Sequence, residues 1–494
     1  MKKKISIIGA GTAGLASAIR LQSQGFDVTI FEKNAQVGGR MYAFSEKGFH
    51  FDVGPTIVMM PEIYREVFEF SGANPDDYIS MQLLDPLYQL HYQDGTSFTV
   101  SSNLTKLIPA LEKISHQDTQ GYLAYLADIY KRYNVARRGF IDRSFLSMKD
   151  IFNFKTIRDT LQLKTFNSAY DSISKFVKNE KLRQALSFQT LYIGVSPFEG
   201  PSIYTIIPMI ELLYGIWFLK GGMYAMALAM EKRFKELGGK VVTNASVEKI
   251  NVTNKQATSI RMNGQNIESD AILVNADFAY AVSQLLDIKD RGKFTPKKIE
   301  KMQYSASSFI MYFGLNKKIK TTVHQIRYAK DFRKNIQDLF EPTLPKDPSF
   351  YLYSPTQIDA SLAPNGKEIL YVLVPVPNRE LHQFTWDAAM TKAFRDQIVS
   401  KIKTIEGFEH FDQHIEVENV MTPKDWEKQF NLQYAATFGF KPILFQSNFF
   451  RPQVKALPIK GLYFAGTSVH PGAGIPIVMK SAKIAAETMI KDLK

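Results

Sequence analysis

Apolar residues and glycines alternate over the first 40 residues in an order typical of a βαβ unit. The β-branched run at 5–8 predicts a buried parallel strand. Apolar residues at helical spacing between Leu15 and Leu21 predict a helix that ends near Gly25. The run at 28–31 predicts a second strand. The pattern therefore predicts strand, glycine turn, helix and strand.

Three glycines separate the first strand from the helix at the spacing of a dinucleotide-binding turn. Gly9 permits the tight turn, Gly11 lets the backbone approach a pyrophosphate, and Gly14 lets helix and strand pack closely. The phosphates would lie at the helix N-terminus, where free N–H groups and the dipole favour negative charge. Glu32 ends the second strand, where its carboxylate can accept both hydroxyls of an adenosine ribose. A carboxylate there argues against a 2′-phosphate, and so against NADP.

The basic residues at 2–4 followed by an apolar run also resemble a secretory signal. The apolar run, however, contains glycines at the dinucleotide spacing and leads directly into the βαβ unit. We therefore interpret the segment as part of the fold and reject a signal peptide.

The rest of the chain reads as blocks of helix and strand without internal repeats. The alternation over 81–100 with Asp94-Gly95 predicts a hairpin of an antiparallel sheet, and 103–186 is mostly helical. Further helices are expected from Pro61, over 222–237, from Thr422 and over 477–493, and further strands at 241–250, 271–277, 309–313 and 369–374. The end of the chain, from 461, repeats the order of strand, glycine turn and helix. The N-terminus of that last helix can stabilise developing negative charge.

The stretch at 202–219 is apolar almost all round and is interrupted by Pro208 and Glu211. It falls short of the ~20 uninterrupted apolar residues that a membrane-spanning helix needs. It can be a buried core helix, the wall of an apolar substrate tunnel, or a helix that dips into one leaflet of a membrane.

Composition narrows the classes of function. The 494 residues are too many for one simple core and indicate two or three subdomains. The net charge of +13 favours an anionic partner. The alternative is that the charge serves only to keep the protein soluble. No nucleic-acid-binding module is present, so a membrane lipid surface is the better candidate.

The chain has no cysteine, which excludes disulfides, cysteine–zinc sites and cysteine nucleophiles. Its eight histidines show no metal-ligand spacing, so no metal site is expected. There is no G-x-S-x-G nucleophile elbow. Redox chemistry would have to come from a bound cofactor.

Three segments together resemble the flavoproteins that include amine oxidases and carotenoid desaturases. They are Glu32, then Gly38-Gly39-Arg40, then Asp52-Val53-Gly54-Pro55-Thr56. Segments 200–204, 221–223 and 470–476 extend the likeness to the bacterial phytoene desaturase type over the whole chain. The resemblance implies FAD as the sole redox cofactor. The cofactor-binding residues that motif and resemblance give are Gly9, Gly11, Gly14, Glu32, Gly39, Arg40, Pro55, Thr56, Val247, Gly466, Gly474, Ile475 and Pro476.

The fold that this resemblance implies is α/β, or α+β overall. A Rossmann-type FAD-binding domain is interleaved with a mixed-sheet substrate domain and a helical membrane-facing subdomain. The expected pieces are 1–80, 221–290 and 456–494 for the FAD-binding domain, 81–102 and 291–455 for the substrate domain, and 103–220 for the helical subdomain.

The resemblance implies a desaturase that acts on a hydrophobic, membrane-borne carotenoid precursor, of the C30 type in its nearest members. Electrons would pass to a quinone or oxygen, and the protein would be cytoplasmic and peripheral on the inner face of the cell membrane. A carotenoid oxidase, ketolase or isomerase of the same fold, and a non-catalytic carotenoid-binding flavoprotein, remain alternatives. The oligomeric state is not readable.

Three residues are candidate catalytic groups. Glu211 lies in the apolar stretch, where desolvation would raise its pKa, or else it faces a structural arginine. Asp150 matches an acidic position of related enzymes, although Asn153 stands where they carry an arginine, and it can instead cap a helix. His470 lies beside the last glycine turn, for function or for packing. A delocalised allylic cation needs only a weak base, which agrees with the lack of a strong acid–base cluster.

Overall fold

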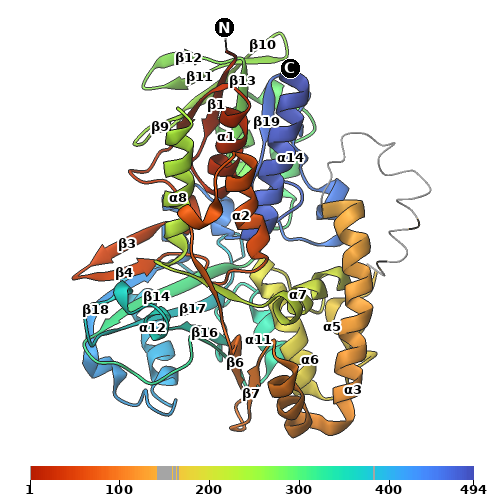
Figure 1. The fold of residues 1–494 in the computed structure, drawn as a ribbon, viewed down its shortest axis with the longest axis vertical. Helices are drawn as coiled ribbons and strands as arrows, with labels where there is room; N and C mark the ends of the chain where they lie inside the picture. The colour runs from red at the N-terminus through yellow and green to blue at the C-terminus, as the bar shows by residue number, and fades with distance from the viewer. Residues whose placement is uncertain (1, 142–157, 159–162, 164–165, 382–383) are drawn as a thin grey trace.

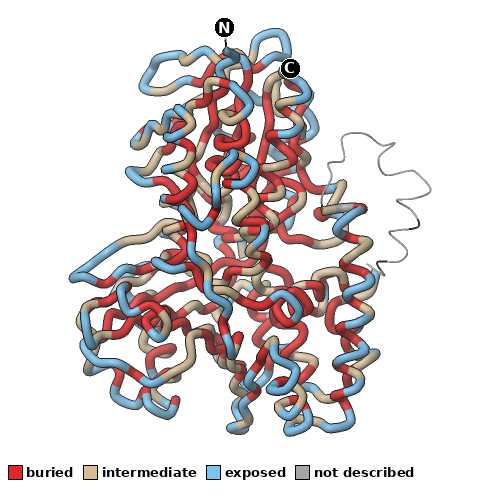
Figure 2. The backbone as a smooth tube through the Cα atoms, in the orientation of Figure 1, coloured by how far each residue is buried: buried red, intermediate tan, exposed pale blue. Residues whose placement is uncertain are grey.

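The chain forms an elongated molecule with two large sheets, one in each half, and both termini at one end (Figure 1). The computed structural model describes residues 2–141, 158, 163, 166–381 and 384–494. Buried residues run through both halves, and exposed residues gather on the outer loops (Figure 2).

A five-stranded parallel sheet in the order β19-β13-β1-β2-β9 forms the half that contains both termini. Its strands are β1 (Lys4–Ile8), β2 (Asp27–Phe31), β9 (Lys240–Val242), β13 (Ala271–Val274) and β19 (Leu462–Phe464). Since both faces of a parallel sheet are covered, these strands are apolar along most of their length. They come from stretches far apart in the sequence, so the sheet is complete only when the C-terminal segment has joined it.

Each face of this sheet has its own covering layer. The helices α1 (Thr12–Ser23), α8 (Met223–Glu236) and α14 (Ile475–Leu493) lie on one face, with α2 (Pro61–Phe70) beside them. An antiparallel sheet of β10 (Lys249–Thr253), β11 (Gln256–Met262) and β12 (Gln265–Glu268) covers the other face with α9 (Phe278–Gln284). Neighbouring strand residues point to opposite faces, so Ile7 packs in the core under the helices and Ile8 in the other core.

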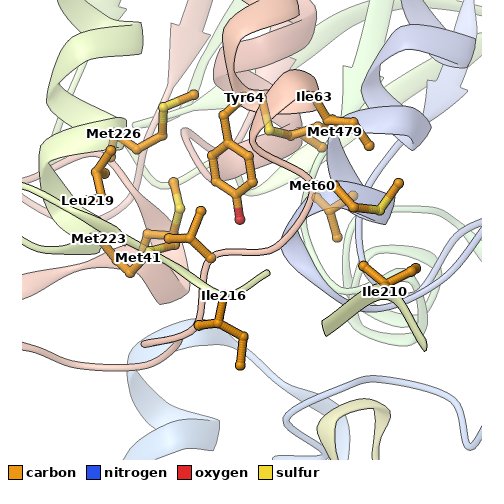
Figure 3. Close-up of a cluster of buried hydrophobic side chains, with 14 of the residues drawn as sticks. Met41, Met60, Ile63, Tyr64, Ile210, Ile216, Leu219, Met223, Met226 and Met479 are labelled. Carbon is orange, nitrogen blue, oxygen red and sulfur yellow. The ribbon is translucent and has the colours of Figure 1, made fainter. Parts of the chain in front are cut away.

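A methionine-rich core lies where α2, α8 and α14 meet, with the Tyr64 ring among its side chains (Figure 3). Unbranched methionines fit the irregular spaces between helices that cross at different angles. The Tyr64 hydroxyl is buried, has no hydrogen-bond partner within the described residues, and has a pKa raised by desolvation. The methionines around it are Met41, Met60, Met223, Met226 and Met479.

A seven-stranded sheet forms the core of the other half. Its order is β18-β14-β17-β16-β15-β6-β7, and all pairs are antiparallel except β15 with β6. The strands are β6 (Tyr88–His91), β7 (Ser97–Val100), β14 (Ser307–Leu315), β15 (His324–Arg327), β16 (Phe350–Tyr353), β17 (Glu368–Val376) and β18 (Ile415–Met421).

The two faces of β14 have different partners. Phe309 packs with residues of α12 (Ala388–Ile402), such as Phe394, on the outer face. Tyr312 points to the other face, where its hydroxyl donates to the Val53 carbonyl at 2.7 Å. The inner face of the sheet therefore meets the loop that follows β4 (Phe49–Asp52).

Helices form the remaining side of the molecule, beside the seven-stranded sheet (Figure 1). They are α3 (Leu104–Ala136), which continues in a π-helical turn Arg137–Ile141, α5 (Ala169–Ser174), α6 (Glu180–Ser187) and α7 (Ile206–Tyr214). Shorter elements are α10 (Pro296–Glu300), α11 (Phe332–Asp338), α13 (Pro423–Phe430), the pair of β3 (Ala43–Glu46) with β4, and the pair of β5 (Met81–Leu83) with β8 (Trp217–Leu219). Among the described helices none is long and apolar enough to cross a lipid bilayer.

The expected α/β fold with an interleaved mixed sheet is confirmed, and the domain boundaries stay a prediction. The single strand expected at 241–250 is wrong: β9 ends at Val242 and β10 begins at Lys249. Asn244 has a left-handed backbone with φ of 54°, which breaks the extended chain. The stretch at 202–219 is likewise no single helix but a 3₁₀ turn, α7 and β8.

Candidate functional site

A cavity of about 410 Å³ runs from the carboxyl ends of the parallel strands to the inner face of the seven-stranded sheet. Gly9 and Glu32 line its first end, and Tyr351 and Tyr371 line the other. Crevices at the carboxyl ends of parallel strands are the usual ligand sites of such sheets. The predicted binding residues that line it are Gly9, Gly11, Glu32, Gly39, Arg40, Pro55, Thr56, Val247, Gly474, Ile475 and Pro476.

The first glycine turn is packed so closely that side chains have no room. A Cβ on Gly14 would lie 2.1 Å from the Gly9 carbonyl oxygen, so Gly14 belongs to the packing of the turn and does not line the cavity. A Cβ on Gly11 would lie 2.9 Å from Asn275 Oδ1. Gly11, Thr12 and Ala13 present the first turn of α1 to the cavity. The N–H groups of a helix's first turn lack intrahelical partners and can bind an anion.

The second glycine turn lies directly on the first. The Gly38 N–H donates to the Ala10 carbonyl at 2.8 Å, and Gly39, with φ of 55°, would place a Cβ 3.1 Å from Gly11 Cα. Two backbones approach here without intervening side chains. The paired turns form one continuous wall of the cavity.

Glu32 is fixed in place beside these turns. Its Oε2 accepts from the Ala10 N–H at 2.8 Å and its Oε1 accepts from the Asn34 N–H at 2.9 Å. Each carboxylate oxygen keeps a second lone pair, so Glu32 can still accept hydroxyl groups of a ribose. Val247 lies in the loop between β9 and β10, two residues after Ala245, whose N–H donates to the Glu32 carbonyl at 2.8 Å.

Arg40 connects the second turn to the C-terminal part of the chain. Its guanidinium donates to the Thr437 carbonyl and, at 3.1 Å, to Thr467 Oγ1. Burial lowers the pKa of Arg40, and the nearby Asp277 carboxylate acts in the opposite direction. Arg40 lines the cavity between the glycine turns and Thr437. Its contact with phosphates and a ribityl chain remains a prediction from the resemblance.

The third glycine turn leads into α14. Gly474, with φ of 96°, precedes the helix, and Ile475 and Pro476 form its first turn at the cavity wall. Gly466 lies behind the wall, and a Cβ there would lie 2.7 Å from Asn275 Nδ2. The N-termini of α1 and α14 thus both face the cavity.

Asn275 was not predicted, yet it joins two of the three turns. Its Oδ1 accepts from the Gly14 N–H at 2.9 Å and its Nδ2 donates to the Ala465 carbonyl at 3.0 Å. The strand was predicted at 271–277 and therefore included Asn275, whereas β13 ends at Val274 and leaves Asn275 at its carboxyl end, where ligand-binding residues of parallel sheets lie.

The far end of the cavity is apolar and aromatic. Tyrosines of the sheet anchor the loop at 53–56 there: the Tyr371 hydroxyl donates to the Gly54 carbonyl at 2.9 Å, and the Tyr351 and Thr56 hydroxyls lie 2.7 Å apart. The apolar and aromatic lining residues at this end are Phe188, Leu191, Tyr192, Ile310, Ile326, Tyr328, Phe332, Phe350, Tyr351, Tyr371 and Leu373.

Glu211 lies behind the cavity wall and is fully buried in α7. Its Oε2 accepts from the Tyr88 hydroxyl at 3.0 Å and from Gln189 Nε2 at 3.1 Å, and no arginine is paired with it among the described residues. Burial raises the pKa of Glu211 to about 7. Tyr192, whose side chain acts to lower that pKa, is itself a lining residue of the cavity.

His470, the second catalytic candidate, does not line the cavity either. His470 is buried. Its backbone N–H donates to the Pro452 carbonyl at 2.8 Å, and its backbone carbonyl accepts from Ser481 Oγ at 2.9 Å. Asp150 lies outside the described residues. The catalytic roles of Glu211, Asp150 and His470 stay predictions.

The residues that line the cavity fit an extended dinucleotide at one end and an apolar substrate at the other. Two helix N-termini and the paired glycine turns suit its phosphates, and the Glu32 carboxylate suits its ribose. The apolar far end suits a substrate without charge. No cluster of metal-ligating side chains occurs in the part of the chain that the structure describes.

Comparison with known proteins agrees with this geometry. Residues 12–490 match the family described as flavin containing amine oxidoreductase. The 4,4′-diapophytoene desaturase (4,4′-diaponeurosporene-forming) of Staphylococcus haemolyticus is 44% identical over 99% of both chains. The protein of the same name from Staphylococcus aureus strain Newman is 43% identical, again over 99% of both chains.

Solved structures show the same fold at low identity. An oxidoreductase from Methanosarcina mazei superposes with a TM-score of 0.65 at 18% identity, covering 98% of this chain and 100% of the other. A putrescine oxidase bound to putrescine gives 0.63 at 12% identity, covering 100% of this chain and 99% of the other.

The predicted resemblance to carotenoid desaturases is confirmed by these relatives, and FAD, the flavin expected from the sequence, is the cofactor that the family and the cavity imply. The chain is therefore an FAD-dependent oxidoreductase that belongs to the flavin-containing amine oxidoreductase family.

Proposed function

We propose that this protein desaturates a C30 carotenoid precursor, converting 4,4′-diapophytoene to 4,4′-diaponeurosporene or further. The observation that carries the proposal is the 44% identity with a desaturase of that name over 99% of both chains. The cavity supports it, because the dinucleotide end opens into an aromatic chamber without a charged substrate-binding cluster.

FAD, when bound, supplies the hydride acceptor for this reaction. The glycine turns, Glu32 and Arg40 would hold it, with its phosphates near the N-terminus of α1. The aromatic residues of the far end would exclude water and align the polyene. Loss of hydride leaves an allylic cation on the substrate, and loss of a neighbouring proton completes the double bond.

The test uses purified protein with FAD and liposomes that contain diapophytoene, under anaerobic conditions. A desaturase must take electrons from the substrate, so the absorbance of oxidised flavin falls on mixing. A carotenoid carrier that keeps FAD as a structural element would leave the flavin spectrum unchanged, and that result would refute the proposal.

We also propose that the protein works at a membrane surface and passes electrons to a quinone or oxygen. The net charge of +13 favours anionic lipid, at roughly 1 kcal/mol for each lysine or arginine near the surface. At the end of α7, Leu213 and Tyr214 are 51% and 39% exposed, and Leu83 nearby is 45% exposed. Such apolar side chains can insert into a lipid surface.

A further inference from the structure

Tyr351, at the apolar end of the cavity, has a hydroxyl held between two groups that can exchange protons with it. Its oxygen lies 2.7 Å from Thr56 Oγ1 and 2.7 Å from His324 Nδ1. Thr56 and Tyr351 line the cavity, whereas His324 lies outside its lining and is 1% exposed. The three side chains form a hydrogen-bonded chain from the cavity wall into the seven-stranded sheet.

The sheet fixes the direction of the histidine ring. β15 and β16 are antiparallel, with His324 opposite Tyr353. Alternate residues of a strand share a face, so Tyr351 and Tyr353 lie on the same side as His324. The ring of His324 stacks on that of Tyr353 with centroids 5.0 Å apart and an interplanar angle of 9°. Held in this way, the ring keeps Nδ1 directed at the Tyr351 hydroxyl.

His324 is neutral in this position. Burial lowers its pKa to about 3. A neutral imidazole carries its proton on one nitrogen and accepts on the other. With the proton on Nε2, which is buried without a hydrogen-bond partner among the described residues, Nδ1 is free to accept from the Tyr351 hydroxyl. The tyrosine oxygen can then take up a proton from the cavity as its own proton moves to Nδ1.

We infer that Tyr351 is a catalytic residue that accepts the proton lost by the substrate, and that His324 is the positioning residue that receives the Tyr351 hydroxyl proton. The inference rests on the proposed desaturation. One substrate C–H bond loses hydride to FAD, the oxidant. The C–H bond on the neighbouring carbon then breaks, and its electron pair forms the new double bond while its proton goes to the Tyr351 oxygen.

The same arrangement resets the site. Desolvation disfavours the charged imidazolium, so the ring returns its proton readily. The proton moves back through the Tyr351 oxygen to water once the product has left. The relay explains how the apolar end of the cavity can remove a proton from the substrate although the residues that line this end are aromatic and aliphatic.

The test compares Tyr351→Phe with Tyr312→Phe. Both variants remove a hydroxyl that contacts the loop at 53–56, but Tyr312 does not line the cavity. We expect Tyr351→Phe to slow the formation of conjugated product in a single turnover by about 100-fold. The bound-flavin spectrum and the substrate affinity should stay unchanged. Tyr312→Phe should keep the wild-type rate, and an equal loss in both variants would show a purely structural role.

His324→Asn separates proton transfer from positioning, because an amide can hold the Tyr351 hydroxyl but cannot take its proton. We expect it to lower the rate by about 10-fold, and an unchanged rate would overturn the relay. As a readout independent of turnover, the ¹⁵N signal of His324 Nδ1 should shift in Tyr351→Phe and not in Tyr312→Phe. An inactive wild type would refute the proposed function and this role together, whereas an active wild type with an active Tyr351→Phe would refute the role alone.

Discussion

Asn275 Oδ1 accepts a hydrogen bond from the backbone N–H of Gly14 at 2.9 Å, which ties the end of β13 to the first turn of α1. The same amide donates to the Ala465 carbonyl with its Nδ2. One side chain therefore sets the spacing between the first and third glycine turns. The geometry of the dinucleotide end depends on an amide, which can donate and accept at once.

Replacing Asn275 by Asp is expected to weaken FAD binding by at least about tenfold. The carboxylate cannot donate to Ala465, and it adds a negative charge where phosphates are to bind. Flavin fluorescence titration gives the dissociation constant. The matched control is Asn251→Asp in β10 of the three-stranded sheet, where Asn251 donates to Ser259 Oγ. Equal affinity in both variants would show that Asn275 does not shape the site.

Replacing Gly11 by Val is expected to give a colourless protein. The Cβ alone would lie 2.9 Å from Asn275 Oδ1, and the added methyl groups would fill the space that the phosphates need. The absorbance of bound flavin in the purified variant measures the effect. Gly72→Ala, whose Cβ meets nothing within 4 Å, also strains a backbone with φ of 79° but lies outside the cavity lining, so it should remain yellow. A yellow Gly11→Val would contradict the placement of the cofactor.

The half of the molecule with the parallel sheet was predictable because the sequence patterns that indicate dinucleotide binding are local. Gly9, Gly11 and Gly14 act through the backbone at fixed spacing, and Glu32 follows at the end of the next strand. The strand expected across 241–250 was wrong for an equally local reason: residues 243–246 contain no glycine or proline to signal a break, yet β9 ends at Val242 and Asn244 has a left-handed backbone.

The apolar half could not be predicted in the same way. Tyr351 meets Thr56 only because β16 packs against a loop almost 300 residues earlier in the sequence, and no spacing rule connects them. Likewise, the sequence left open whether Glu211 faces an arginine. Its partners Tyr88 and Gln189 come from separate elements that only the folded chain brings together.

Glu211 makes stability depend on pH. Burial raises its pKa from 4.5 to about 7, so the folded state binds the proton more tightly than the unfolded state. The contribution of the Glu211 proton to the free energy of unfolding is complete below pH 4.5 and is lost as the pH rises through about 7. Glu211→Gln cannot ionise, so its free energy of unfolding should rise relative to wild type by about 3 kcal/mol between pH 4.5 and 8. Urea denaturation at both pH values tests this, with the exposed Glu268→Gln as control.

Leu213→Asp is expected to reduce binding to anionic liposomes by about tenfold, because it removes an exposed apolar side chain and adds a negative charge. Co-sedimentation with liposomes measures the loss. Ile288, which is 70% exposed and lies next to α9, provides the control variant Ile288→Asp. If both variants bind as the wild type does, α7 is not the membrane-contacting element.

The mass of the product tests the account most directly. Purified protein with FAD and liposome-borne diapophytoene is supplied with a quinone or oxygen, and the products are examined by mass spectrometry. Each desaturation removes two hydrogens, so we predict a stepwise loss of about 2 Da, with a red shift of absorption at each step. A gain of oxygen mass, or an unchanged mass with a changed isomer pattern, would contradict desaturation and identify an oxidase or an isomerase of the same fold.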